Sequence, residues 1–389
     1  TIFLFLGLLL VQIVVFSQNN DRIFVEEGDK LVDFGDYEDA ILFYQLAIEE
    51  NPNNVRAQFM TGKCFLITTS GKREAVNYLK KAFDLDPEVD SDLLFMIGEG
   101  HRFRYEFDEA VDFYNEYLNE IEVNRRAYEG NDIDALKKRA LKRIEECKIA
   151  ELLIASPVPF EPKNIGGMVN SEDFDYAPTI NLDETLMYFT SKRKGSTGGF
   201  KDRDNKYFED IWVTEKVNGQ WTAPKNLGES INTKQHDSNI GLSPDGNTLY
   251  IYSTENNGDI YFSQKKDNVW TEVKPLDKTI NTEYRESTIN VSENNNFMFF
   301  TSDRPGGQGD LDIYVIRRNK KGKWGNPENI GNVVNSEYSE EGPFFDVSTS
   351  TLYFSSKGHD GMGGYDLFKS QWDTLTNFWS QPVNLGYPI

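Results

Sequence analysis

One block of sequence returns along the second half of the chain, and it constrains the fold more than any single residue does. The block holds a Trp, a Pro, then Asn, Leu or Ile and Gly, and it ends in Ile or Val, Asn, and Ser or Thr. Its last Asn is Asn170, Asn232, Asn281 and Asn335 in turn, so the copies are 62, 49 and 54 residues apart. A repeat of this length is typical of propeller blades or solenoid coils.

Three further strand patterns precede the block in each period. A short strand begins at an acidic or small residue, as in ESTINV from Glu286, and a strongly apolar strand follows, as in FMFFTS from Phe297. A third strand begins with Asp, as in DIYV from Asp312. With the block as a fourth strand, each period is predicted to be a four-stranded antiparallel sheet, the unit of a β-propeller blade. Four periods are present; four blades could close, but a larger ring, truncated in this chain, is favoured.

The first half of the chain shows a shorter period. Gly28, Gly62 and Gly98 are 34 and 36 residues apart, and each is followed by small and apolar residues at helical spacing. Pro52 and Pro87 stand where the second helix of a pair should end. This pattern resembles the tetratricopeptide repeat (TPR), in which two antiparallel helices meet at small residues.

A long capping helix is predicted from Ile133 to Ile154, and a Pro-rich linker follows it. The apolar run from Ile2 to Phe16 fits the core of a secretory signal with a clipped start, and a retained membrane anchor is the alternative. The chain therefore divides into a signal peptide at 1–17, TPR-like helices at 18–154, the linker at 155–162 and a propeller at 163–389.

Composition excludes several classes of function. A net charge of −22 argues against nucleic acid, which needs clustered Lys and Arg. Two cysteines are too few for a disulfide framework, and both lie in helical stretches where a buried thiol is expected. The three histidines have no Ser or Cys motif around them. We therefore expect no enzyme, no catalytic residue, no cofactor, no resident metal and no small-molecule substrate.

The turn between the first two strands of a blade carries a resemblance. Ser243 to Gly246 reads SPDG, as in WD40-like propellers of the TolB type, and Gly-rich loops run from Arg304 and His359. Together with the helical repeats, these features resemble Bacteroidetes-type periplasmic proteins that join TPRs to such a propeller and then to an OmpA-like peptidoglycan-binding domain. One member is a component of type IX secretion. The resemblance implies a periplasmic location at the outer membrane or cell wall, with other envelope proteins as partners. Peptidoglycan would bind only through a further domain.

Two sets of residues are candidates for binding. In TPR arrays the first helices line a concave groove, which suits an extended peptide or a helix unless the capping helix fills it. Carboxylates that enter the innermost propeller strands are expected to converge at one mouth of an axial channel, where a cation or cationic ligand is the minor alternative. The groove set is Arg22, Asp29, Arg56, Phe59, Lys63, Phe95, Glu99 and Arg102. The channel-mouth set is Tyr176, Asp237, Glu286 and Glu341.

Two further features have structural interpretations that are favoured over functional ones. The Asp that opens each third strand is expected to accept backbone N–H bonds and fix its loop, rather than bind calcium. The basic insertion from Lys192 to Lys206 is expected to be a solvated hairpin tip rather than a partner-binding loop.

The sequence as a whole predicts a non-catalytic envelope scaffold for protein–protein interactions, in secretion or envelope anchoring. The competing hypothesis is a glycan-binding or glycoside-processing propeller. In that case Asp237, Glu286 and Glu341 would form an acidic axial pocket.

Overall fold

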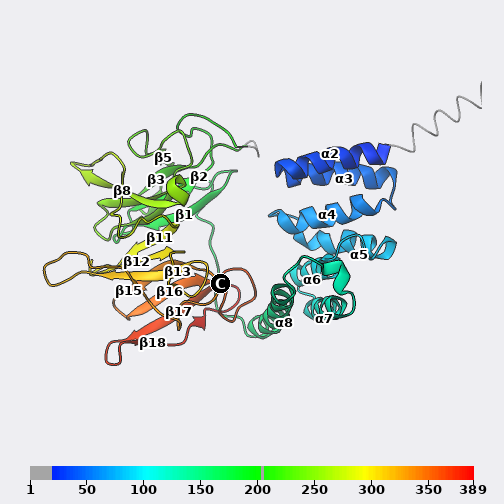
Figure 1. The fold of residues 1–389 in the computed structure, drawn as a ribbon. Helices are drawn as coiled ribbons and strands as arrows, with labels where there is room; N and C mark the ends of the chain where they lie inside the picture. The colour runs from blue at the N-terminus through cyan, green and yellow to red at the C-terminus, as the bar shows by residue number, and fades with distance from the viewer. Residues whose placement is uncertain (1–19, 203–205) are drawn as a thin grey trace, which may run out of the picture. The chain divides into compact units, whose positions relative to one another are not determined.

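The chain forms two compact units, one ending at Leu152 and the other beginning at Leu153 (Figure 1). The structure, a computed structural model, describes residues 20–202 and 206–389. The expected signal peptide, residues 1–17, lies outside them. Among the described residues, no helix combines the length and the apolar character needed to span a bilayer.

The first unit is a helical array in which short turns fold successive helices back on one another. The pairs are α2 with α3, α4 with α5, and α6 with α7, and α8 follows. Their bounds are α2 Asn20–Phe34, α3 Tyr37–Glu50, α4 Val55–Ile67, α5 Ala75–Leu85, α6 Leu93–Phe103, α7 Phe107–Val123 and α8 Ile133–Ala155.

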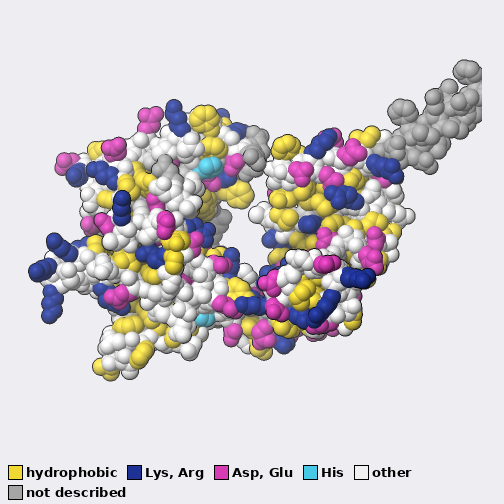
Figure 2. Space-filling view, in the orientation of Figure 1, with side chains coloured by type: hydrophobic (Ala, Val, Ile, Leu, Met, Phe, Trp, Pro, Cys, Tyr) yellow, Lys and Arg dark blue, Asp and Glu magenta, His cyan; other side chains and the backbone are white. Residues whose placement is uncertain are grey.

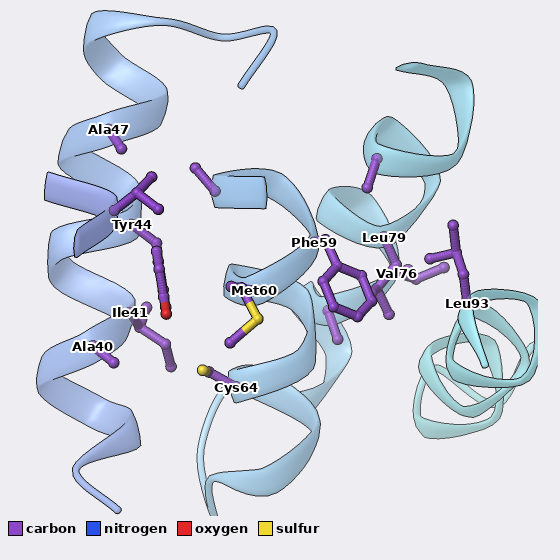
Figure 3. Packing of buried hydrophobic residues seen from close by; sticks show 14 of the residues in the cluster. Ala40, Ile41, Tyr44, Ala47, Phe59, Met60, Cys64, Val76, Leu79 and Leu93 are labelled. Carbon is purple, nitrogen blue, oxygen red and sulfur yellow. The ribbon is translucent and has the colours of Figure 1, made fainter. Parts of the chain in front are cut away.

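Close helix crossings explain the spacing of the glycines. A Cβ added at Gly28 would lie 2.7 Å from the ring of Tyr44, and one added at Gly98 would lie 2.6 Å from the ring of Tyr114. Only glycine leaves room for these rings, so the first helix of each pair approaches the second closely. Tyr44, Met60 and Leu79 belong to the core that joins α3, α4 and α5 (Figure 3).

The second unit holds four antiparallel sheets within its described residues, and each is one blade. Blade one is β1 (Asp175–Ile180), β2 (Leu186–Ser191), β3 (Asp210–Val217) and β5 (Lys225–Asn226). Blade two is β6 (Ser238–Leu242), β7 (Thr248–Ser253), β8 (Asp259–Lys266) and β10 (Lys274–Pro275). Blade three is β11 (Glu286–Val291), β12 (Phe297–Ser302), β13 (Asp312–Arg317) and β14 (Glu328–Asn329). Blade four is β15 (Glu340–Asp346), β16 (Thr351–Ser356), β17 (Asp366–Asp373) and β19 (Val383–Asn384).

The Trp of the repeated block adds a second short pairing to the third strand in three blades. These strands are β4 (Gln220–Trp221), β9 (Val269–Trp270) and β18 (Phe378–Trp379). Successive first strands lie against one another, β1 against β6, β6 against β11 and β11 against β15. Apolar side chains fill the space between neighbouring blades, as where Phe299 and Ile313 of blade three meet Phe354 of blade four.

The last Asn of the repeated block fixes the block to its own blade. Asn335 is almost fully buried; its side-chain oxygen accepts from Ile313 N at 2.9 Å and its side-chain nitrogen donates to Ile313 O at 3.0 Å. Asn232 bonds Ile211 in the same way at 2.9 and 3.0 Å. In each blade the Asn oxygen satisfies a buried N–H, and the Asn nitrogen adds a second donor to a carbonyl that also accepts from Ile330 N or Leu227 N at 3.2 Å, which explains why the block repeats an Asn here.

The predicted fold class is confirmed: an α-helical TPR-type array precedes an all-β, propeller-like unit of four-stranded blades. A larger, truncated ring stays a prediction. Pro52 and Pro87 lie just beyond the ends of α3 and α5, as expected. Both cysteines, Cys64 and Cys147, are free and buried, which raises the pKa of their thiols to about 11 and about 12.

Candidate functional site

The first strands of all four blades line one open cavity of about 620 Å³. Its walls are largely apolar, because the strand segments that face it carry aliphatic, proline and aromatic side chains. Three of these are well exposed: Ile180 at 50%, Leu182 at 63% and Phe344 at 51%. Apolar side chains left open in a concave surface are typical of binding sites.

Polar side chains in this cavity join neighbouring blades. Asn239, fully buried in β6, donates from its side-chain nitrogen to Ala177 O at 2.8 Å and Thr179 Oγ1 at 3.0 Å in β1. Asn290 accepts from Phe345 N at 3.1 Å, linking β11 to β15. Within the described residues the side-chain oxygen of Asn239 has no hydrogen-bond partner. The cavity wall thus contains a buried acceptor among apolar groups.

The turns between the first and second strands carry acidic residues, and two of these, Glu184 and Glu293, are among the residues that line the cavity. The four turns, residues 181–185, 243–247, 292–296 and 346–350, contain no Lys or Arg. Their acidic residues are Asp183, Glu184, Asp245, Glu293 and Asp346. We call these five residues the acidic rim.

Hydroxyl groups keep three rim carboxylates ionised. Hydrogen bonds from Thr185, Ser243 and Ser348 lower the pKa of Asp183, Asp245 and Asp346, respectively. The predicted SPDG turn is also present: Gly246 N donates to Ser243 O at 2.8 Å, and Gly246 has a φ of 69°. The apolar cavity therefore opens at a negatively charged end.

The channel-mouth set does not line this cavity. Asp237 and Glu286 are buried and bond to the end of the preceding block: Asp237 accepts from Thr233 N at 2.6 Å, and Glu286 accepts from Thr282 N at 2.9 Å. The expectation that they converge on the channel is therefore wrong. Tyr176 is 40% exposed and close to Glu209, and Glu341 is half-buried beside Tyr365.

Two members of that set are also one residue out of register. The equivalents of Asp237 and Glu286 are Asp175, which accepts from Ser171 N at 2.6 Å, and Glu340, which accepts from Ser336 N at 2.7 Å. Because side chains alternate between faces along a strand, a shift of one residue moves a side chain to the opposite face. All four carboxylates bind the end of the preceding block instead of lining the cavity. The hypothesis of a glycoside-processing propeller therefore lacks the acidic axial pocket that it requires.

Three of the four Asp residues that open the third strands accept backbone N–H bonds from their loops, as predicted, whereas Asp259 accepts from the side-chain nitrogen of Asn256 at 3.2 Å. Asp210 accepts from Thr197 N at 2.6 Å, Asp312 accepts from Gly309 N at 3.3 Å, and Asp366 accepts from Gly363 N at 3.2 Å. Among the residues that the structure describes, no group of three or more His, Cys, Asp or Glu side chains is placed to hold a metal ion.

The basic insertion of blade one is largely paired with acidic groups of its own unit. Lys192 lies 3.4 Å from Glu209, and Lys206 lies 2.9 Å from Asp173. Arg193 lies 2.6 Å from Asp175, and Arg203 is outside the described residues. These pairings favour a structural role for the insertion. On the face shown in Figure 2, charges of both signs are interspersed on each unit rather than gathered in a basic patch.

The helical groove divides into two parts. In the first two repeats, Arg22 is exposed and Arg56 pairs with Asp29 at 2.9 Å, while Phe59 is buried in the core. Lys63 lies 5.4 Å from the centre of the Phe59 ring. The groove of the first two repeats therefore presents exposed charged side chains over a buried apolar residue, Phe59.

In the third repeat, α8 covers the predicted groove residues. The guanidinium of Arg139 lies 3.9 Å from the centre of the Phe95 ring, and Arg143 lies 2.9 Å from Glu99. Glu99 also pairs with Arg102 at 2.9 Å. Burial raises the pKa of Glu99, but the two arginines outweigh this effect and hold the pKa below its usual value. Phe95 and Glu99 thus contact the capping helix, and Arg102 pairs with Glu99 beneath it.

Comparisons with known proteins return partial likenesses. No family model matches the chain, and neither does any curated protein. Among solved structures, the TPR domain of Arabidopsis OM64 is 19% identical with a TM-score of 0.27, and the match covers 32% of this chain and 98% of that one. PcrH in complex with the chaperone binding region of PopD is 15% identical with a TM-score of 0.29, covering 34% and 95%.

The chain is also similar to a different solved structure, TolB from Acinetobacter baumannii. The identity is 15% and the TM-score 0.37, and the match covers 56% of this chain. This chain spans only 45% of that TolB chain. The fold class therefore rests on the helix pairs and four-stranded sheets described above.

Proposed function

We propose that this protein is a non-catalytic scaffold that binds other proteins, with the propeller cavity as its main contact site. The observation that carries the proposal is an open cavity lined by the first strands of all four blades, with apolar walls and exposed side chains such as Phe344. The uncovered part of the helical groove, around Arg56 and Lys63, is a second contact surface. Two repeat architectures in one chain suit such a role.

The acidic rim defines the partner. A segment with one or two large apolar side chains would bury them against Ile180, Ile289 and Phe344. Lys or Arg residues flanking that segment would meet carboxylates that stay ionised at neutral pH. We therefore propose a basic, partly apolar peptide segment as the ligand.

The cellular setting is part of the same proposal. The apolar run from Ile2 to Phe16 and the resemblance to envelope proteins of the TPR–propeller type support a periplasmic location at the outer membrane or cell wall. They also support a role in secretion or envelope anchoring. Fractionation of cells expressing the full-length protein tests this: recovery in the cytosol contradicts it.

An array of synthetic peptides tests the binding site. Peptides with a central Phe or Leu flanked by Lys should bind, and those flanked by Glu should not. Ile180→Glu should weaken binding at least tenfold, because it places a charge in the apolar wall. Leu375→Glu is the matched control, since Leu375 is 92% exposed and does not line the cavity.

Two results would contradict the proposal. Equal binding by the Ile180→Glu and Leu375→Glu variants would remove the cavity as the site. Binding of oligosaccharides but of no peptide would instead favour the glycan hypothesis.

A further inference from the structure

One hairpin of blade three is an exception to the mixed charge of the surface. Residues 317–323 read RRNKKGK, and no Asp or Glu occurs between Asp312 and Glu328. Such a run stands out in a chain whose net charge is −22. The hairpin follows β13 and projects from the blade (Figure 1). We call residues 317–323 the basic hairpin.

The corresponding hairpins of the other three blades do not share this charge. Residues 217–220, 266–269 and 373–378 read VNGQ, KDNV and DTLTNF. Three blades therefore close the same connection without a run of Lys and Arg, so the fold of a blade does not require one. The charge of the basic hairpin calls for a reason outside its own blade.

Hydrogen bonds and a ring contact hold the basic hairpin in one shape. The Asn319 N–H donates to Lys323 O at 2.8 Å, and the Asn319 side-chain oxygen accepts from Lys321 N at 2.9 Å. The guanidinium of Arg318 lies 4.2 Å from the centre of the Trp324 ring. A loop that is already ordered loses little conformational entropy when it binds a partner.

Three lysines of the basic hairpin have no carboxylate of their own. Lys320, Lys321 and Lys323 are exposed and form no ion pair within the described residues, whereas Arg317 pairs with Glu328. Like charges held this close repel one another, and an anionic partner would relieve the repulsion. The basic hairpin is therefore suited to bind a group of carboxylates or phosphates.

The basic hairpin lies at the same end of the propeller unit as the acidic rim. In blade three, Arg318 N donates to Asn296 O, in the turn between the first two strands, at 2.9 Å. Equivalent bonds join Lys216 N to Thr185 O at 2.7 Å, Lys265 N to Asn247 O at 2.8 Å and Trp372 N to Ser350 O at 2.8 Å. The first strands line the cavity and the third strands lie further out. This end therefore carries the acidic rim toward the cavity and the basic hairpin toward the periphery.

Two carboxylates of the acidic rim are open to a cation. Glu293 is exposed and forms no ion pair in the part of the chain that the structure describes, and Glu184 is exposed and lies 3.9 Å from Lys216. Apolar side chains are exposed at the same end, Leu182 at 63% and Val269 at 66%. Charges of both signs together with exposed apolar groups are typical of a surface that binds protein.

The arrangement of charges decides between the alternative occupants. A lipid bilayer or a nucleic acid presents negative charge over its whole surface, so the acidic rim would repel it. A second copy of this chain presents carboxylates and lysines on one surface. When two such ends face each other about a twofold axis, each basic hairpin meets the acidic rim of the other copy.

We propose that the chain forms a face-to-face dimer in which the basic hairpin of each copy binds the acidic rim of the other. The net charge of −22 opposes association at long range. At about 0.15 M salt this repulsion is screened beyond about 8 Å, so the contacts between neighbouring charges prevail. The proposal requires the acidic rim but no peptide in the cavity.

Sedimentation velocity of the full chain, without peptide, tests the proposal. Wild type should dimerise with a Kd of about 10⁻⁴ M, because exposed charge pairs contribute little each. The hairpin variant Lys320→Glu/Lys321→Glu should weaken dimerisation at least about tenfold, because each substitution acts twice in a twofold interface. The rim variant Glu184→Lys/Glu293→Lys should have the same effect. Circular dichroism and the melting temperature check that both variants fold.

A mixture of the two variants gives the sharpest measurement. Neither variant has opposite charges to bring together with a copy of itself. In the mixture, the reversed hairpin of one variant faces the reversed rim of the other, and the unchanged hairpin and rim face each other as in wild type. The equimolar mixture should therefore associate about as tightly as wild type.

A control variant matches the change in net charge. Lys274→Glu/Lys278→Glu reverses two exposed lysines of the blade-two block and should leave dimerisation unchanged. An equal loss in this variant overturns the proposal. So does a mixture that fails to associate, or a wild type that stays monomeric at about ten times the expected Kd.

A lipid surface is tested with vesicles that contain phosphatidylglycerol. If wild type binds them, the hairpin variant does not, and both dimerise equally, the basic hairpin belongs to a lipid contact and the proposal is overturned. None of these measurements includes a peptide ligand, so their outcome leaves the function proposed for the cavity to its own test.

Discussion

The helical unit and the propeller unit use repetition in opposite ways. In the helical unit, α8 lies on the third repeat through Arg139 and Arg143, so the end of the array consumes part of its own groove. In the propeller unit, the first strand of every blade pairs on one side only and leaves its other side to the cavity. In the helical unit, the capping helix therefore covers part of the surface that could bind a partner. In the propeller unit, each added blade contributes another strand to the wall of the cavity.

The two units also differ in what satisfies their buried polar groups. Charged pairs do so under α8, whereas the blades use neutral side-chain amides as well as carboxylates. The largest effect is therefore expected in the helical unit. Glu99→Gln would remove the carboxylate that Arg102 and Arg143 share, leaving Arg143 with Glu146 alone, and should cost about 3–5 kcal/mol. Hydrogen exchange resolved by unit measures this, since two units need not unfold together.

The control for this change is Glu145→Gln, which removes an exposed partner of Lys148 on α8. That pair should contribute less than about 1 kcal/mol. Equal losses for the two variants would mean that the buried charges under α8 do not stabilise the unit.

A smaller effect is expected when a neutral amide is lost from a blade. Asn335→Ala leaves the buried N–H of Ile313 unsatisfied and removes one of the two hydrogen bonds that its C=O accepts, which should cost about 1–3 kcal/mol. Asn170→Ala is the matched change in the first copy of the block, where the Asn side chain bonds only Asn164 within the described residues. Denaturant unfolding followed by Trp fluorescence measures both; similar losses would contradict the role given to the buried Asn.

The smallest effect compares blade two with blade three. The folded-state pKa of Asp237 is about 6 against an ordinary value of 3.8, so its burial destabilises the fold increasingly as the pH rises through this interval. In metal-free buffer, Asp237→Asn should therefore stabilise the protein at pH 8 by about 1–2 kcal/mol, with no difference at pH 3.5. Glu286→Gln should destabilise blade three at pH 8, because it leaves Arg304 unpaired. If both substitutions stabilise the protein at pH 8, or both destabilise it, the proposed difference between blades two and three is refuted.

The sequence was sufficient to predict both repeat types, because their signals recur at a fixed spacing and depend on local chemistry. Glycine at a helix crossing and Asn at the end of the block have one physical reason each, so every copy repeats them. The capping helix could be predicted as a helix. Its position over Phe95 and Glu99 could not, since that depends on arginines more than 40 residues further along the chain.

The register error in the channel-mouth set has a plain cause. Tyr176 and Glu341 stand at the start of strands that look alike in sequence, but each first strand contains a register shift near its start. The spacing from the end of the block identifies the equivalent carboxylates, because each one stands four positions after the Ser or Thr that ends the block, as Asp175 does after Ser171. The sequence does not predict the acidic rim, because only one of its four turns has the SPDG motif and the other three share no pattern with it.

The paired residues at the end of each block have a mechanical consequence. Asn335 accepts a hydrogen bond from Ile313 N in blade three. The next residue, Ser336, donates its backbone N–H to Glu340 in blade four. Two adjacent residues therefore attach the chain to two neighbouring sheets. A force that pulls on one sheet is transmitted to the other through the peptide bond between these residues. Seams between blades are thus strong points, and the hairpin tips are where such a chain can be cut or extended with least damage.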